Sequence, residues 1–234
     1  MIKFFRSIRR SLLEKGHTAK YLKYAVGEIV LVVIGILIAL SINNKNSEIA
    51  NRKAEKTFYH NIKEQLLDDA KNIESVREMN LAYTAQFEYA IKIIETENRI
   101  QKDTLGNIAV NLTNYTDFDR QGNIYETMVN SGDIKLLTNT DIIEKLRRLE
   151  ETYIYVNRME TIHFDAVMSL VPSLMESIRL FSSTIEDENY LYSYKSQNMF
   201  VISLKIMNEK ETVYYRAINE IEEIIVLLDK EIEY

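Results

Sequence analysis

The chain has 234 residues, of which 46% are hydrophobic, and its formal net charge is −6. It contains no cysteine, which excludes disulfide bonds, thiolate metal sites and cysteine nucleophiles. Only six glycines and one proline are present, too few for the many turns of a sheet protein, so we expect an all-α fold with long helices and few connections.

The charge is distributed unevenly along the chain. Residues 1–42 contain seven Lys and Arg against two Glu, a net charge of +5, so residues 43–234 have a net charge of −11. Nucleic-acid binding depends on the neutralisation of phosphates by basic side chains. The acidic body therefore argues against nucleic acid as a partner, whereas the basic end can contact an anionic membrane surface.

Residues 1–19 are predicted to form a cytoplasmic segment that begins with a short amphipathic helix. Apolar residues from Ile2 to Leu13 can form one face, and Gly16 is suited to end the helix. Such a helix is typical of a segment that lies flat on a membrane, although a disordered basic tail is the alternative. The opposite face would hold the membrane-surface basic residues Lys3, Arg6, Arg9 and Arg10.

A transmembrane helix is predicted over residues 20–43. Its central 19 residues, from Tyr24 to Ile42, contain Glu28 as the only charge. A helix of this length covers about 28 Å, which is close to the hydrocarbon thickness of a bilayer. The core helix of a soluble protein is seldom apolar on all sides over this length. A cleaved signal peptide is the more serious alternative, but its apolar region usually has only 7–15 residues.

The basic residues before the predicted span also predict its direction. Under the positive-inside rule, the N-terminus lies in the cytoplasm and the acidic body lies outside it. In a Gram-negative cell this means a single-pass protein of the inner membrane with a periplasmic domain. The lipid bilayer is thus its first expected partner.

Two features within the span could support association. Small residues at a spacing of four let two helices approach closely, and this pattern predicts a self-association face that consists of Gly27, Leu31, Gly35 and Ala39. Glu28 allows two interpretations. It could be an intramembrane carboxylate that pairs with a partner, or its side chain could extend back towards the headgroups.

Residues 44–234 are predicted to form an extracytoplasmic antiparallel helical bundle into which the membrane helix continues. Apolar residues recur at helical spacing after Phe58, after Ile142 and after Val213, which predicts three long helices. Any break in the first would lie within the polar stretch 43–51. Short helices are expected over 104–112 and 124–130, and Gly132 is suited to end the second. A capping box at Thr138 and Asp141 should open the second long helix, and Pro172 should kink it. A polar connection over 186–196 should lead to the third.

Two stretches of the sequence resemble a known family. They are MIKFFRSIRRSLLEKG with KYLKYAVGEIVLVVIGILIALSINN, and YETMVNSGDIKLLTNTDIIEKLRRLEETY. Both resemble a family of short single-span membrane proteins of unknown function that is abundant in Bacteroidota. The resemblance implies an inner-membrane anchor and a helical extracytoplasmic domain, and it supplies no activity and no catalytic residue.

No catalytic residues and no cofactor are predicted, because no nucleophile is spaced to pair with a base. Glu160 and His163 have the Glu-x-x-His spacing of di-iron bundles, but such sites need a second pair, so a hydrogen-bonded core histidine is the favoured interpretation.

Asp117, Asp119, Gln121 and Gly122 resemble the start of a calcium loop. Met128 stands where that loop requires a chelating Glu, so we expect a solvated loop and no metal.

Two functions are compatible with this pattern. The first is a membrane-anchored, non-enzymatic interaction or scaffold protein of the cell envelope, a homo-oligomer or a partner of another envelope protein. The second is a sensor or regulatory module whose bundle binds a small ligand and relays a shift through the membrane helix. A pocket between helices with convergent polar groups would favour the second, and a solidly packed bundle would favour the first.

Overall fold

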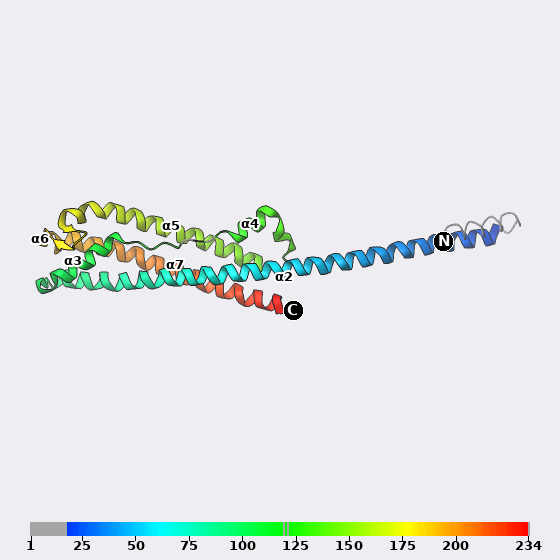
Figure 1. Ribbon diagram of the computed structural model, residues 1–234, viewed down its shortest axis with the longest axis horizontal. Helices are drawn as coiled ribbons and strands as arrows, with labels where there is room; N and C mark the ends of the chain where they lie inside the picture. Colours follow the sequence, from blue (N-terminus) through cyan, green and yellow to red (C-terminus); the bar gives the residue numbers. More distant parts are fainter. Residues whose placement is uncertain (1–17, 119, 121, 234) are drawn as a thin grey trace. The chain divides into compact units, whose positions relative to one another are not determined.

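The computed structural model describes residues 18–118, 120 and 122–233, and the chain divides into two units, residues 1–55 and 56–234. The predicted amphipathic helix, with Lys3, Arg6, Arg9 and Arg10, lies outside the described residues. Helix α2 extends from Thr18 to Glu95 and contributes residues to both units (Figure 1). The polar stretch 43–51 is helical, so α2 has no break there.

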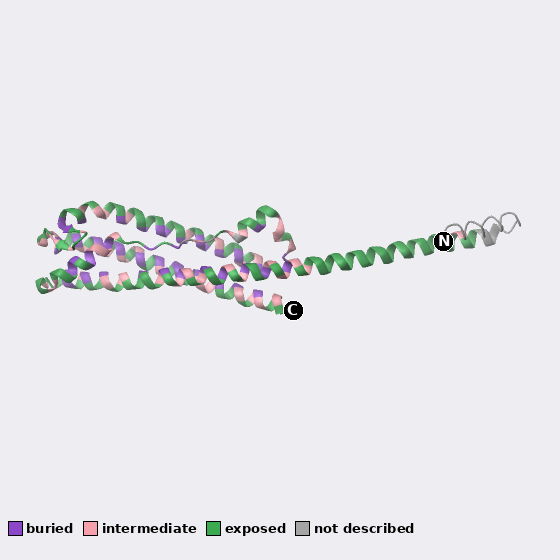
Figure 2. Ribbon diagram, viewed as in Figure 1, coloured by how far each residue is buried: buried purple, intermediate pink, exposed green. Residues whose placement is uncertain are grey.

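In the first unit, the side chains of α2 are open to the surroundings. Every residue from Ile29 to Asn51 is exposed (Figure 2). The most apolar 18-residue window of the helix has a mean hydropathy of 2.7, and none of it is buried. By length and composition, α2 therefore contains a segment able to cross a membrane.

The second unit is built around three long helices. These are α2 from Lys56 onward, α5 (Thr140–Ser177) and α7 (Tyr194–Glu233). Ion pairs Lys63–Asp229 at 2.5 Å and Arg77–Glu211 at 2.7 Å join α2 to α7 in opposite directions. Helix α7 is also antiparallel to α5, since Lys145 pairs with Glu223 while Tyr155 bonds Glu209. It follows that α2 and α5 are parallel to each other.

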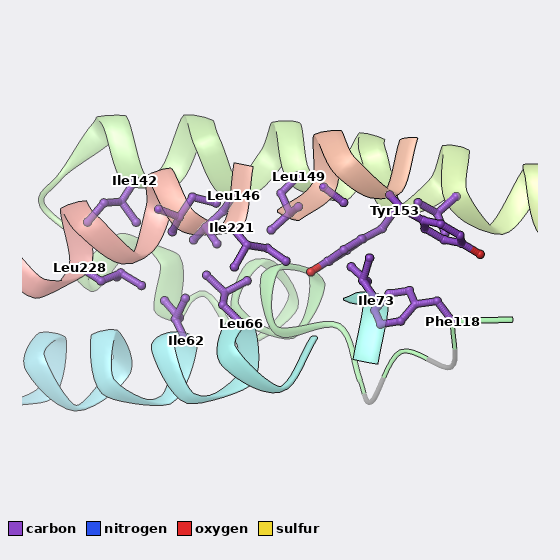
Figure 3. Packing of buried hydrophobic residues seen from close by; sticks show 14 of the residues in the cluster. Ile62, Leu66, Ile73, Phe118, Ile142, Leu146, Leu149, Tyr153, Ile221 and Leu228 are labelled. Carbon is purple, nitrogen blue, oxygen red and sulfur yellow. The ribbon is translucent and has the colours of Figure 1, made fainter. Parts of the chain in front are cut away.

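The apolar stripes of these helices face one another and form the larger of two cores. Figure 3 shows Ile62 and Leu66 of α2 facing Leu146 and Leu149 of α5, with Ile221 of α7 between them. All five are buried, as the 3.6-residue period of the stripes requires. Burial of a side chain of this size contributes about 2 kcal/mol, so the bundle is held chiefly by these stripes.

Because α2 and α5 are parallel, the chain must return along the bundle between them. It does so through residues 114–123, called here the crossover segment, whose described residues form no helix or strand (Figure 1). An extended chain covers about 3.3 Å per residue against 1.5 Å in a helix, so few residues suffice. Thr116 and Phe118 of this segment are buried. Asp117 and Gly122 are exposed, as expected of a solvated loop, but Phe118 packs against Tyr153 in the main core.

A second core closes the end of the bundle where α2 ends. Beyond the three long helices, this core contains residues of α3 (Lys102–Val110), η2 (Asn111–Thr113), β1 (Ile178–Arg179) and α6 (Glu188–Leu191). Ile185 of β2 (Thr184–Ile185), which forms a hairpin with β1, packs against it, and the short helix η1 (Arg99–Gln101) precedes α3. The hairpin was not predicted. It fits closely on α3 because Gly106 has no side chain, and a Cβ there would lie 3.1 Å from Cγ1 of Ile185.

At the opposite end, the chain turns into α5 through α4 (Ile124–Ser131) and η3 (Asp133–Leu136). Gly132 ends α4 with φ +81, as predicted. The residue that caps α5 is Asn139, whose side-chain oxygen accepts from the N–H groups of Asp141 and Ile142. The N-cap is thus Asn139 and not the predicted Thr138, and Ile142 at the third helical position has no side chain that could complete a capping box. Helix α5 continues through Pro172 to Ser177.

Candidate functional site

The site lies where the crossover segment passes between α5 and α7. Five buried polar residues meet there and are called the crossover cluster: Thr116, Glu160, His163, Lys210 and Tyr214. Thr116 comes from the crossover segment, the next two from α5, and the last two from α7. Glu160 and His163 face the same side because they are separated by three residues on a helix.

Glu160 and Lys210 hold the crossover segment by its backbone. The N–H of Phe118 donates to Oε1 of Glu160 at 2.8 Å. Nζ of Lys210 donates to the carbonyl oxygen of Thr116 at 2.6 Å and to its Oγ1 at 2.7 Å. These bonds matter because the extended segment has no helical partner for its own amides. Two charged side chains thus replace the hydrogen bonds of a regular element.

The remaining contacts complete the cluster. The Tyr214 hydroxyl donates to Oε1 of Glu160 at 2.6 Å, and Nζ of Lys210 lies 3.3 Å from Nδ1 of His163. Burial, reinforced by the charge of Lys210, lowers the pKa of His163 to about 4. The ring is therefore neutral at pH 7, and Nδ1 can accept a hydrogen bond from the lysine.

Burial also shifts the two charged groups towards their neutral forms. It raises the pKa of Glu160 to about 7, although the hydrogen bonds from Tyr214 and Phe118 and the charge of Lys210 oppose the shift. It lowers the pKa of Lys210 to about 8, against the attraction of Glu160 and Asp117. Both groups consequently titrate close to neutral pH, as groups at functional sites often do.

One oxygen of Glu160 is left without a hydrogen bond. The residue is only 5% exposed, and its Oε2 is buried without a hydrogen-bond partner. When protonated, this carboxyl can bond the neighbouring Asp117, which raises its pKa further. When ionised, it has no donor, and an unsatisfied buried acceptor of this kind costs about 1–3 kcal/mol.

A pocket of about 250 Å³ opens beside this oxygen. Tyr115 and Phe164 meet edge to face with their ring centroids 5.2 Å apart and form one wall. The two carboxyl groups and the polar side chains of α5 complete the lining, which consists of Tyr115, Asp117, Asn157, Glu160, Thr161 and Phe164. Polar and aromatic groups from two elements thus converge on one cavity, a common arrangement of small-ligand sites.

A second buried polar cluster holds the other end of the crossover segment without forming a pocket of useful size. Tyr153 donates to Asp69 at 2.9 Å, and Arg120 lies 4.4 Å from the Tyr153 ring centroid and pairs with Glu150 at 2.7 Å. The cavity beside these groups measures about 10 Å³. That is no more than one water molecule requires, so this cluster is structural.

The sequence-predicted site residues are distributed over both units. Gly27, Leu31, Gly35 and Ala39 lie on α2 of the first unit and are exposed, and Glu28 lies on the same helix. Glu160 and His163 are brought together in the cluster, and His163, 2% exposed and bonded to Lys210, is the core histidine that we favoured. Among the described residues, no group of three or more His, Cys, Asp or Glu could hold a metal ion.

Sequence reasoning missed Lys210, Tyr214 and Tyr115. A signal for Lys210 was present, because it falls in phase with the apolar stripe of α7, between Met207 and Val213. A lysine at such a position is either paired or functional. Its partners could not be inferred, since they lie 47 and 94 residues away in the chain.

The fold and site define an all-α protein that combines an exposed apolar helix with a bundle around a buried polar cluster. Residues 28–177, more than half of the chain, match the model of a family of unknown function (DUF6090), and the protein belongs to that family. No curated protein and no solved structure gives a significant match to this chain.

The raised pKa of Glu160 predicts a pH-dependent difference between the wild type and Glu160→Gln. In the native state Glu160 keeps its proton up to about pH 7, whereas in the unfolded chain it releases the proton near pH 4.5. The stronger proton binding of the native state therefore stabilises it fully below pH 4.5, and this stabilisation is lost as the pH rises to 7. The free energy of unfolding of Glu160→Gln relative to wild type should rise over this interval by on the order of 3 kcal/mol.

Chemical denaturation at several pH values between 4.5 and 7, below the pKa of about 8 of the neighbouring Lys210, measures this difference, in which the titrations of groups outside the cluster cancel. Glu176→Gln, an exposed position on the same helix, is the matched control and should show a constant difference. A pH-independent difference for Glu160→Gln would contradict the assignment of a near-neutral pKa to this residue.

Proposed function

We propose that this protein is a membrane-anchored, non-enzymatic regulatory module whose helical bundle binds a small ligand. The anchor is the apolar part of α2, where residues 29–42 are exposed on every side of the helix. Large apolar side chains in such a run need lipid or protein around them. A lipid bilayer satisfies all of them at once, which supports the anchoring role.

The charge distribution supports the orientation. Seven Lys and Arg precede residue 24, and the residues after Ile42 have a net charge of −11. The positive-inside rule then puts the N-terminus in the cytoplasm and the bundle in the periplasm, with the anchor in the inner membrane.

The orientation predicts the behaviour of reporters joined to Tyr234. Alkaline phosphatase, which is active only outside the cytoplasm, should be active in this fusion, and a green fluorescent protein fusion exported by the same route should be dark. Activity measurements on whole cells test this. The opposite pattern, or recovery of the chain from the soluble fraction after salt washing, would refute the proposed localisation.

The ligand-binding role is based on the unpartnered Oε2 of Glu160 beside the 250 Å³ pocket. Other buried acceptors of the described residues also lack a donor, Oδ1 of Asn80 among them, but this one lines a pocket in which a ligand that donates to it would remove the cost. The structure is also suited to transmit binding. Helix α7 supplies Lys210, and one turn earlier on this helix the carbonyl oxygen of Met207 accepts a hydrogen bond from Nδ2 of Asn80 on α2 at 3.0 Å.

A pocket-filling substitution tests this function. Thr161 is exposed and lines the pocket, so Thr161→Trp should obstruct it, whereas Ser169→Trp, two turns further along α5, should not. Thermal unfolding is followed with a panel of small cationic, neutral and anionic metabolites. At least one should stabilise the wild type and Ser169→Trp by about 2–3 kcal/mol near 100 times its Kd.

The same compound should leave Thr161→Trp unaffected and should slow amide exchange of α2 around Asn80 in the wild type. If no compound stabilises the wild type, or if Thr161→Trp responds equally, the pocket is not a ligand site.

An interaction or scaffold role is the second candidate. It is favoured by the open surface of α2 in the first unit, where a Cβ added at Gly27 or Gly35 would have no atom within 4 Å. A second copy of the helix could approach closely along the face formed by Gly27, Leu31, Gly35 and Ala39. The protein would then be a homo-oligomer in the membrane, or would bind another envelope protein there.

Replacement of both glycines tests this role. Gly27→Ile with Gly35→Ile should abolish a dimer that crosslinks in native membranes, because branched side chains prevent close helix approach. Ile29→Leu with Ile36→Leu, on other faces of the same helix, is the control and should crosslink as the wild type does. A wild-type protein that stays monomeric would exclude self-association through this face.

A further inference from the structure

We propose that the pocket beside Glu160 binds a small organic cation, a primary ammonium or guanidinium group, with Glu160 and Asp117 as its counter-charges. This inference rests on the ligand-binding function proposed above and specifies the class of ligand. Four observations support it: the free oxygen of Glu160, the way Lys210 is used, the chemistry of the walls, and the size of the pocket.

The free oxygen requires a hydrogen-bond donor. Oε1 of Glu160 already accepts from the Phe118 N–H at 2.8 Å and the Tyr214 hydroxyl at 2.6 Å, and Oε2 accepts from no group. Asp117 lies on the same side, close enough to share a proton with Glu160. Two carboxyl groups with one unused, buried oxygen form an acceptor site for N–H groups that bear a positive charge.

Lys210 does not fill this role, although it is nearby and fully buried. An ammonium group has three N–H donors. Its Nζ lies within bonding distance of the Thr116 carbonyl oxygen, Thr116 Oγ1 and His163 Nδ1, which are three neutral acceptors. The charge of Lys210 is thus directed at the crossover backbone and the imidazole. With all three charged groups ionised, the site keeps a net charge of −1.

The walls favour a cation over an anion. Tyr115 and Phe164 provide aromatic faces, which attract ammonium and guanidinium groups by about 0.5–2 kcal/mol. Asn157 and Thr161 at the rim are neutral, and the described lining residues include no Lys or Arg. An anionic ligand would therefore meet two carboxylates, and the single charge of Lys210 does not balance both.

The size and ligand set favour an organic cation over a metal ion. A pocket of about 250 Å³ is smaller than most sites for drug-sized ligands, so it suits a compact molecule. Hard divalent ions require about six oxygen ligands in close geometry. The two carboxyl groups supply too few, and the aromatic wall supplies none.

Proton binding should compete with the cation. Glu160 is faced by Asp117 from the crossover segment and by Tyr214 and Lys210 from α7, and its pKa is raised to about 7 by burial. A ligand cation needs the ionised carboxylate. Its affinity should therefore be highest near pH 8 and should fall towards tenfold per pH unit below about pH 7.

The test uses the full chain in detergent at pH 8 and three four-carbon probes that differ in charge. Butylammonium is the cation, 1-butanol the neutral analogue and butyrate the anion, and Kd values are obtained from saturation-transfer NMR titrations. Butylammonium should bind at least tenfold more tightly than the other two. Both Glu160→Gln and the exposed-site variant Asp117→Asn should weaken it at least tenfold, while Glu176→Gln should leave its Kd unchanged.

The outcomes separate this inference from the function on which it rests. If butanol or butyrate binds as tightly and competes for the same pocket, the ligand class is wrong but the ligand-binding function stands. If Ca²⁺ or Mg²⁺ binds and Glu160→Gln abolishes that binding, the site is a metal site and the inference fails. If butylammonium does not bind, the cation proposal fails. It also fails if Glu176→Gln weakens butylammonium binding as much as Asp117→Asn does. In either case the metabolite panel still tests the ligand-binding function independently.

Discussion

The path of the chain between α3 and α4 depends on two charged side chains that bond the backbone of the crossover segment at its buried residues, Thr116 and Phe118. The Phe118 N–H and the Thr116 carbonyl lie where no regular element can pair them, and each would cost about 1–3 kcal/mol if it were left unsatisfied. Glu160 and Lys210 pair with them at 2.8 and 2.6 Å. Burial of these charges is itself unfavourable, so the arrangement is stable only while the contacts within the cluster remain intact.

This constraint explains the topology of the bundle. Helices α2 and α5 are parallel because the crossover segment returns the chain along their length before α5 begins. A short turn would have made them antiparallel neighbours, as in simple up-down bundles. The crossover segment is fixed at its other end by Arg120, which pairs with Glu150 and lies over the Tyr153 ring. The two polar clusters thus hold one segment at two positions.

The two clusters differ in the space beside them, which supports the proposed ligand-binding role of the crossover cluster alone. Around Arg120, whose Nε is also buried without a hydrogen-bond partner, the cavity of about 10 Å³ leaves no room for a ligand. Around Glu160, one buried oxygen is unsatisfied and a 250 Å³ pocket lies beside it. A polar network that is only partly satisfied lowers stability, and binding of a ligand that completes it would couple occupancy of the pocket to the packing of the crossover segment and α7.

The sequence by itself determined the helical class, the apolar segment of α2 and the stripes of the three long helices. These are properties of local composition and period, which a single stretch of chain displays without its partners. It also singled out Glu160 and His163 as a buried pair. The N-cap at Asn139 and the hairpin at Ile178–Ile185 were missed, because neighbouring residues of similar propensity compete for such roles.

Only the tertiary structure decided the parallel arrangement of α2 and α5, the burial of Phe118 and the partners of Lys210. Each of these depends on contacts between residues far apart in the chain, such as Lys210 and Thr116. A polar segment rich in Asn, Thr and Asp has the composition of a solvated loop. Thr116 and Phe118 are nevertheless buried, because charged groups on α5 and α7 bond their backbone, and the positions of those groups cannot be read from the segment itself.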